Sequence, residues 1–295
     1  MPPPAQAPLR RLWRGHRRAL GLTYALTGVE NGCEVFYPLA TGHAIDGLLA
    51  GRPARLALLG ALWAFHLAVG LGRHLYDTRV FTAVYAELAA DMVARQRAAG
   101  VAPEQVVARV ALSRELVDFF ESEVPAVGSA AVRFAGAVGM LFTYDARIGA
   151  YALATLAPAL AVTRWFARRV ARLHRALNDQ LERQGAVVTA RPPAAVARHF
   201  ARLARWRVQI SNAEALTWGV VELAAIGLTL AALLRLTVGG RAAAAGGTAG
   251  VTAGTIYAVL SYVYSFYDGV ISLPATVQRV VRVRDIGVRV ADAGR

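Results

Sequence analysis

Six long apolar runs divide this chain, and they constrain its fold more than any other feature of the sequence. A helix needs roughly 17–25 largely apolar residues to cross a bilayer, and each run reaches that length with its flanking residues. Hydrophobic residues make up 56% of the chain, whereas soluble domains contain about 45–50%. We therefore expect an all-α, polytopic membrane protein. The predicted spans are Leu20–Ile45, Leu56–Gly72, Val124–Phe142, Ile148–Val162, Leu216–Leu236 and Thr255–Leu273.

The positive charges lie almost entirely on one side of these spans. The chain has no lysine, so all 33 basic residues are arginines. One arginine, Arg133, lies inside a span, and only five lie on the opposite side: Arg52, Arg55, Arg147, Arg235 and Arg241. Arginine-rich segments that flank spans remain in the cytoplasm. We expect both termini there and the protein in a plasma membrane, the inner membrane of a bacterium.

The net charge of +14 would by itself suggest a nucleic-acid partner, because clustered arginines neutralise phosphates. Here the arginines alternate with apolar runs, which indicates a lipid bilayer as the partner and no nucleic acid. The absence of lysine excludes a P-loop, and the lone Cys33 excludes an internal disulfide and a cysteine-based zinc site. No catalytic or metal-binding motif is present, so we expect neither an enzyme nor a cofactor in this chain.

The two long connections on the arginine-rich side keep a helical pattern. Apolar residues recur at spacings of three and four from Thr82 and again from Thr163, so the second and fourth helices should run past the bilayer. Pro103 and the pair Pro192-Pro193 should each begin a new helix. We expect a descending helix, a short cross-helix and an ascending helix in each connection. Residues 1–18 then form a short basic arm, residues 19–290 the transmembrane domain and residues 291–295 a tail.

Three segments, in this order, resemble the membrane domain of ABC exporters. PLATGHAID at Pro38–Asp46 is similar to the outer end of that family's first helix. FTYDARIGAYALATLAPAL at Phe142–Leu160 is similar to its tight outer turn and fourth helix, and the segment Ser261–Val290 to its sixth helix and the continuation into the cytoplasm. The resemblance covers nearly the whole chain. It is strongest to six-span ABC membrane domains that occur as separate chains.

The resemblance implies a transporter that works as a dimer by alternating access. In that family the sixth helix leads into a nucleotide-binding domain, but this sequence contains neither a Walker A lysine nor a signature motif. We therefore expect ATP to act only through a separate ATPase subunit. The region from Ala186 to Arg198 is shorter than the family's second cytoplasmic cross-helix region.

Polar residues form one stripe on the first predicted helix and another on the sixth. Helical spacing places Thr23, Thr27, Glu30, Glu34 and Thr41 on one face. The second stripe is formed by Tyr257, Ser261, Tyr264 and Asp268. Acids inside a span are costly and tend to face a cavity or a partner. Because the first and sixth helices line the central cavity in the family resembled, we expect Thr27, Glu30, Glu34 and the second stripe to line one here. The alternative is that these groups are hydrogen-bonded within one helical bundle.

Arg133 is the only arginine well inside a predicted span, and it needs an acid, water or a route to the surface because it cannot lose its proton. Counting at 1.5 Å per residue places Glu222 and Asp268 at a similar depth. We expect Arg133 to contact one of these two acids, unless its side chain reaches the membrane surface instead.

Three functions remain open from the sequence. The first is the membrane subunit of an ABC-type exporter, the second a proton-coupled transporter with the same fold that uses Glu30, Glu34, Glu222 or Asp268, and the third a membrane scaffold or regulator. The stripes suggest an amphipathic or cationic substrate.

Overall fold

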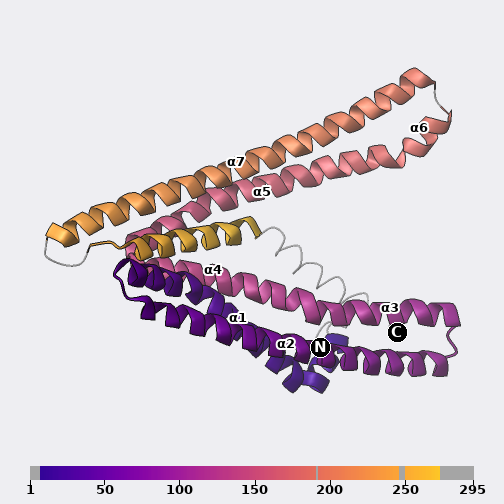
Figure 1. Cartoon of the computed structure of the whole chain (residues 1–295). Coiled ribbons are helices and arrows are strands. Elements are labelled where there is room, and N and C mark those ends of the chain that lie inside the picture. Colours follow the sequence, from indigo (N-terminus) through magenta and orange to yellow (C-terminus); the bar gives the residue numbers. More distant parts are fainter. Residues whose placement is uncertain (1–6, 191, 246–249, 273–295) are drawn as a thin grey trace. The chain divides into compact units, whose positions relative to one another are not determined.

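The computed structural model describes residues 7–190, 192–245 and 250–272, and these residues form helices and no strand (Figure 1). Residues 253–272 form the last described helix. The elements before it are α1 (Ala7–Leu49), η2 (Pro53–Arg55), α2 (Leu56–Ala98), α3 (Pro103–Asp118), η3 (Phe119–Glu123), α4 (Val124–Tyr144), α5 (Ala146–Glu182), α6 (Gln184–Ala190) and α7 (Pro193–Ala245). The chain divides into two compact units, one from residues up to Met140 and from Gly239 onward, the other from Leu141 to Val238.

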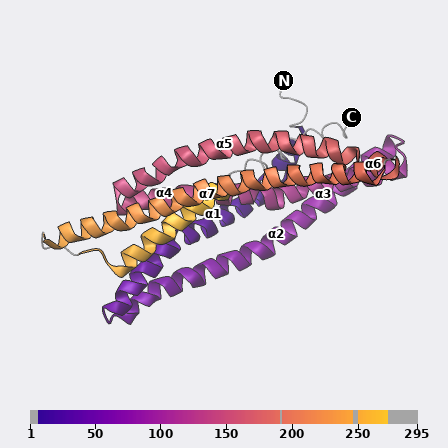
Figure 2. The same ribbon diagram turned by 90° about the horizontal axis from the view of Figure 1, so that it is seen from above.

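In the first unit, α1 and α2 form a long antiparallel hairpin (Figures 1 and 2). Gly51 has a positive φ of 66°, which glycine adopts without steric cost. The Arg52 amide donates to the Gly47 carbonyl at 2.7 Å, and Pro53 begins η2 with the fixed φ that a helix start needs. The turn is therefore tight, and residues equally distant from it along the two helices face each other.

Leu20, where the sequence predicted the first membrane span to begin, lies in a protein core. It is fully buried with Phe81, Val117 and Phe119, so α1 packs at this point against the part of α2 that follows the apolar run. Core burial and lipid contact favour the same side chains, and a hydropathy pattern alone does not separate them. The first apolar run thus extends beyond the part that faces the second predicted span.

The connection from α2 to α4 differs from the prediction. Gly100, with a φ of 71°, ends α2, and Pro103 begins the next helix as expected. However, this fully described stretch contains no separate cross-helix, because α3 continues through η3 into α4 without a break. η3 is a single turn of π-helix, and its buried Phe119 and Phe120 pack in the core with Leu20.

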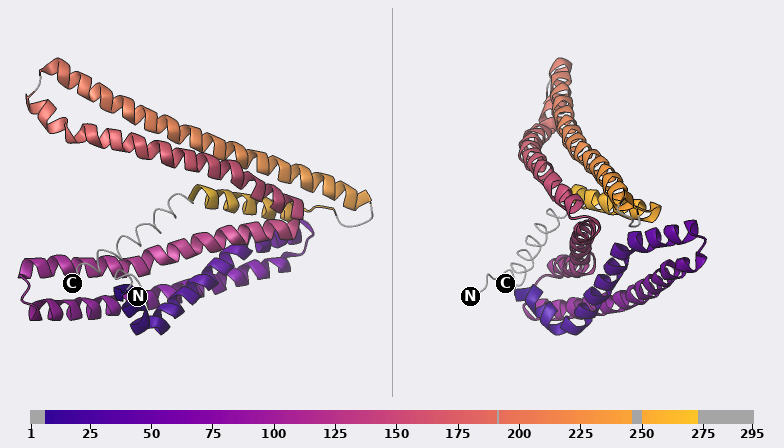
Figure 3. Two further views of the ribbon diagram at one scale, coloured as in Figure 1. Left: turned by 180° about the vertical axis from the view of Figure 1, so that it is seen from behind. Right: turned by 90° about the vertical axis from the view of Figure 1, so that its left-hand side faces the viewer.

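The second unit is built from α5, α6 and α7. The long helices α5 and α7 run antiparallel, and α6 connects them at one end (Figure 3). Asp145 caps α5, since its side chain accepts a hydrogen bond from the Arg147 amide at 2.8 Å. Outside the predicted spans, Leu173, Leu177 and Ile210 form a buried cluster between α5 and α7. A short helix does lie between two long ones, as predicted, but it precedes Pro192-Pro193, and Pro193 begins the long helix α7 rather than the cross-helix.

The glycine- and alanine-rich segment that begins at Gly239 is helical at its start, because α7 continues to Ala245. Among the described residues, length and composition identify four helical segments that could cross a membrane: Pro53–Ala98, Phe119–Tyr144, Ala146–Glu182 and Pro193–Gly240. The predicted first and sixth spans, which carry the polar stripes, do not meet this criterion, so the count of six spans stays a prediction.

A polar network between the first two helices and the turn that closes the bundle

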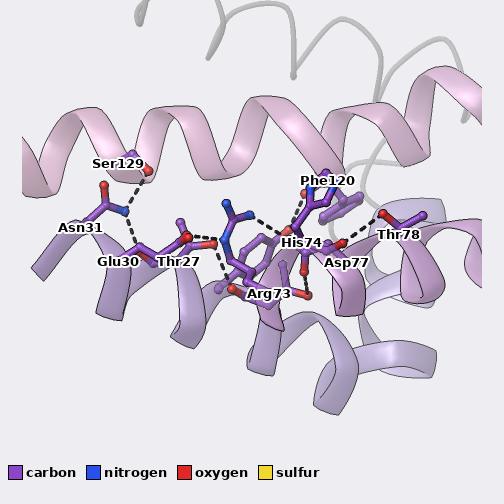
Figure 4. Close-up of polar contacts among 11 residues, drawn as sticks. Thr27, Glu30, Asn31, Arg73, His74, Asp77, Thr78, Phe120 and Ser129 are labelled. Carbon is purple, nitrogen blue, oxygen red and sulfur yellow. Dashed lines mark hydrogen bonds and ion pairs between the residues drawn. The ribbon is translucent and has the colours of Figure 1, made fainter. Parts of the chain in front are cut away.

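A network of charged and polar side chains joins α1 to α2 (Figure 4). The Arg73 guanidinium binds two carboxylates, Glu30 through Nε and Asp77 through Nη1, the latter at 2.8 Å. Asp77 also accepts a hydrogen bond from the Thr23 hydroxyl at 2.8 Å. Thr23 is fully buried, and the side chains of Glu30 and Asp77 are each only 13% exposed. One guanidinium thus neutralises one of two largely buried acids, and the three groups carry a net charge of −1 when all are ionised.

The neighbouring face of α1 binds α4. The Asn31 amide donates to the Ser129 hydroxyl at 2.8 Å and to the Thr27 carbonyl at 2.7 Å. One turn further, Glu34 forms an ion pair with Arg133 at 3.4 Å. A polar side of α1 is therefore occupied by contacts within the first unit. This agrees with the alternative that the stripe on α1 is hydrogen-bonded within one helical bundle.

Arg133 forms its ion pair with Glu34 and not with Asp268, one of the two partners that the sequence predicted. Asp268 does lie at the level of Arg133, because the neighbouring Phe134 packs on Phe266 and Gly269. The side chain of Arg133, however, meets Glu34 of α1, and Asp268 lies on the face that points away from α1 and α4. Asp268 belongs to the same unit and makes no ion pair with Arg133, whereas Glu222 belongs to the other unit, and its proximity to Arg133 stays a prediction.

Hydrogen bonds along the hairpin indicate where its apolar part ends. Glu30 is paired with Arg73, and Tyr37 with His66. In each pair the two residues are almost equally far from Gly51. Since Arg73 directly follows the uncharged run Leu56–Gly72, Glu30 lies at the end of the apolar layer rather than about 15 Å inside it, as a count from Leu20 suggests.

At the opposite end, α1 closely approaches the helix of residues 253–272. A Cβ atom on Gly42 would lie 2.4 Å from the Gly254 carbonyl oxygen, so only glycine fits. Asp46, the last residue of the PLATGHAID segment, accepts the Gly254 amide at 2.8 Å and the Thr252 hydroxyl at 2.6 Å. It therefore supplies acceptors at the start of that helix, where amides have no intrahelical partner.

The same helix is bound to α1 and α4 along its inner face. The Tyr262 hydroxyl donates to the Val35 carbonyl at 2.8 Å, next to the carbonyl that Pro38 leaves without its helical donor. Phe266 stacks on Phe134 of α4, with ring centroids 5.4 Å apart. Val263 is buried as well. These contacts fix which face of the helix points away from α1 and α4.

The predicted stripe of the sixth span lies on that outward face. Tyr264 is 66% exposed and Tyr257 42% exposed, Asp268 is exposed and Ser261 partly so. The two predicted stripes therefore differ: that of α1 is largely engaged within the unit, and that of residues 253–272 is presented outward. Whether either lines a cavity stays a prediction.

The sequence interpretation did not identify Arg73 and Asp77 as site residues, nor Ser129. A signal for the first two existed, because residues equally far from a tight helical turn face each other and Arg73 mirrors Glu30. Ser129 has no comparable signal. Among the residues that the structure describes, no group of three or more His, Cys, Asp or Glu side chains could hold a metal ion.

Comparison with known families adds one finding. Residues 9–280 match a family model described as the ABC transporter transmembrane region, and no family of nucleotide-binding domains is matched. No curated protein shows significant similarity to the chain.

Proposed function

The chain belongs to the family of ABC transporter transmembrane regions, and from this premise we propose that it is the membrane subunit of an exporter-like transporter. Two copies form a homodimer that moves its substrate by alternating access, and a separate ATPase subunit supplies the energy. The protein resides in a plasma membrane, the inner membrane of a bacterium, with both termini in the cytoplasm. The family match over nearly the whole chain carries this proposal.

The outward stripe on residues 253–272 supports a dimer. An acid and two tyrosines on one face of a membrane helix are poorly solvated by hydrocarbon, and hydrogen-bonding partners or water in a cavity stabilise them. A second copy with the same stripe would enclose such a cavity, because a two-fold interface brings identical faces together. Tyr257, Ser261, Tyr264 and Asp268 would then contact the substrate.

Thiol labelling tests the cavity. In a background in which Cys33 is replaced by serine, Tyr264→Cys should react rapidly with a maleimide, because the reagent requires a thiolate and hence water. Leu67→Cys is the matched control, since Leu67 is 73% exposed but lies in the apolar run of α2. Equally slow labelling at both positions would show that residue 264 faces lipid and would remove the support for a cavity.

The partner subunit is tested separately. The purified chain should not hydrolyse ATP, whereas a complex isolated from native membranes should contain a chain with a P-loop and hydrolyse ATP in a manner that substrate stimulates. ATP hydrolysis by the purified chain alone, lost on its mutation, would contradict this assignment.

A proton-coupled transporter is the second candidate, and the sharing of Arg73 by Glu30 and Asp77 favours it. A proton carrier needs a carboxylate inside the protein, and Glu30 and Asp77, with one cation between them, leave one negative charge unbalanced. Uptake into vesicles that is driven by a pH gradient without ATP, and abolished by Glu30→Gln, would favour this candidate over the first.

A further inference from the structure

A groove with a volume of about 420 Å³ lies between α1 and α2. Its walls belong to the first unit and come mainly from the apolar run of α2. Leu67 is 73% exposed and Leu71 58% exposed, so the groove is open along its side, where the apolar run indicates lipid. The lining residues are Tyr37, Trp63, His66, Leu67, Gly70 and Leu71.

Two polar atoms in the middle of the groove are paired with each other. The Tyr37 hydroxyl shares a 2.5 Å hydrogen bond with His66 Nδ1. Trp63 meets the Tyr37 ring edge-on, with centroids 6.4 Å apart. The aromatic rings and the leucines therefore supply most of the surface in this part of the groove, which suits a hydrocarbon chain.

A carboxylate adjoins the groove at Gly70. Glu30 Oε1 lies 2.6 Å from the point that a Cβ atom on Gly70 would occupy, whereas Oε2 binds Arg73. The Glu30 side chain is 13% exposed, so part of its carboxylate can be reached from the groove. A hydrogen bond from a charged donor to a carboxylate stabilises more than one between neutral groups. Glu30 therefore marks a position where a ligand with charged N–H donors would be stabilised.

We propose that this groove binds one membrane phospholipid with a primary ammonium headgroup. The ammonium group donates a hydrogen bond to Glu30 Oε1, and an acyl chain lies along Leu67 and Trp63. Two observations fit this occupant. Glu30 is level with the end of the apolar layer, where headgroups begin, and the net charge of −1 on Glu30, Arg73 and Asp77 is balanced by a cation.

Native mass spectrometry of the full chain, extracted from bilayers with equal parts of phosphatidylethanolamine, phosphatidylcholine and phosphatidylglycerol, tests this proposal. The unmodified chain should retain one phosphatidylethanolamine. Glu30→Gln should reduce that occupancy about tenfold or more, as expected for loss of a charged hydrogen bond. Retention of phosphatidylcholine to the same extent would overturn the proposal, because its quaternary ammonium group has no N–H. A preference for phosphatidylglycerol would overturn it as well.

Two further variants place the lipid in the groove. Leu67→Trp should block the groove from its open side and reduce occupancy while leaving the pair of Glu30 and Arg73 in place. Gly72→Leu is the matched control on the same helix, since a Cβ atom there would meet nothing within 4 Å, and it should retain the lipid. Full retention in Leu67→Trp, or equal loss in both variants, would show that the lipid lies elsewhere. The inference depends on membrane embedding and not on transport, so its failure would leave the proposed function intact.

Discussion

Replacing Gly42 by alanine should destabilise the protein, although alanine is the better helix former. Gly42 lies in α1 where the helix of residues 253–272 approaches most closely. The added Cβ would lie 2.4 Å from the Gly254 carbonyl oxygen and 3.4 Å from the Ala258 Cβ. The nearest atom is backbone, which cannot rotate away as a flexible side chain would, so the two helices must move apart. The same substitution at Gly32, also in α1, adds a methyl group that meets nothing within 4 Å.

The two substitutions should therefore have opposite signs. Alanine in place of glycine within a helix contributes about 0.5–1 kcal/mol of stability, which Gly32→Ala should show in full. Overpacking a close contact costs roughly 1–3 kcal/mol, so Gly42→Ala should lose the whole propensity gain and become less stable than the unmodified chain. The gap between the variants should be about 1–3 kcal/mol, the overpacking cost itself, because the propensity gain is common to both.

Thermal unfolding of both variants in one mild detergent, followed by size-exclusion chromatography of the folded fraction, measures this gap. A difference of that size corresponds to roughly 2–12 °C in the unfolding midpoint, using about 2–4 °C per kcal/mol for chains of similar size. Equal midpoints for Gly42→Ala and Gly32→Ala would show that the approach of the two helices is not tight. The argument that glycine is required at this contact would then be wrong.

Three further substitutions test the network and the closing turn. Arg73→Gln should destabilise the protein by about 3–5 kcal/mol, because it leaves two largely buried acids without a cation. Arg95→Gln breaks only an exposed ion pair and should cost at most about 1 kcal/mol. Similar melting points for the two variants would contradict the assignment of a buried network. Asp46→Ala should cost about 0.5–2 kcal/mol through loss of a helix cap, and no change in the melting point would mean that water replaces the carboxylate without loss. Tyr37→Phe should cost about 0.5–1.5 kcal/mol through loss of its hydrogen bond to His66, and a gain in stability would show that this bond is not formed in the membrane.

Much of the helical architecture could be predicted because it depends on local chemistry. The second and fourth predicted spans continue as the long helices α2 and α5, since the spacing of apolar residues persists past each apolar run. Pro103 and Pro193 begin helices as expected, because proline lacks the amide that a helix start leaves unpaired. The separate cross-helix expected after Pro103 was wrong. The π-turn at Phe119–Glu123, stabilised by buried phenylalanines, carries α3 directly into α4.

The candidate site was only partly accessible from the sequence. The stripe on α1 was recognised. Counting an equal number of residues along both helices from the tight turn at Gly51 would have added Arg73 as the partner of Glu30. The partner of Arg133 was not accessible, because it depends on how far α4 is shifted along α1. That shift is set by packing between residues distant in the chain. One example is Val35, whose side chain occupies the space that a Cβ atom on Gly136 would fill.

Composition and periodicity by themselves determined that this chain forms long apolar helices bounded by arginines, because the need to satisfy backbone groups in a membrane acts on each segment separately. The tertiary structure alone decided which face of each helix is engaged. It turned Thr23 and Asn31 of α1 toward neighbouring helices and left Tyr264 exposed. The physical reason is that polar residues recur at the same spacing along a helix whether they contact another helix or line a cavity. Only the register between neighbouring helices decides which of these two environments they meet.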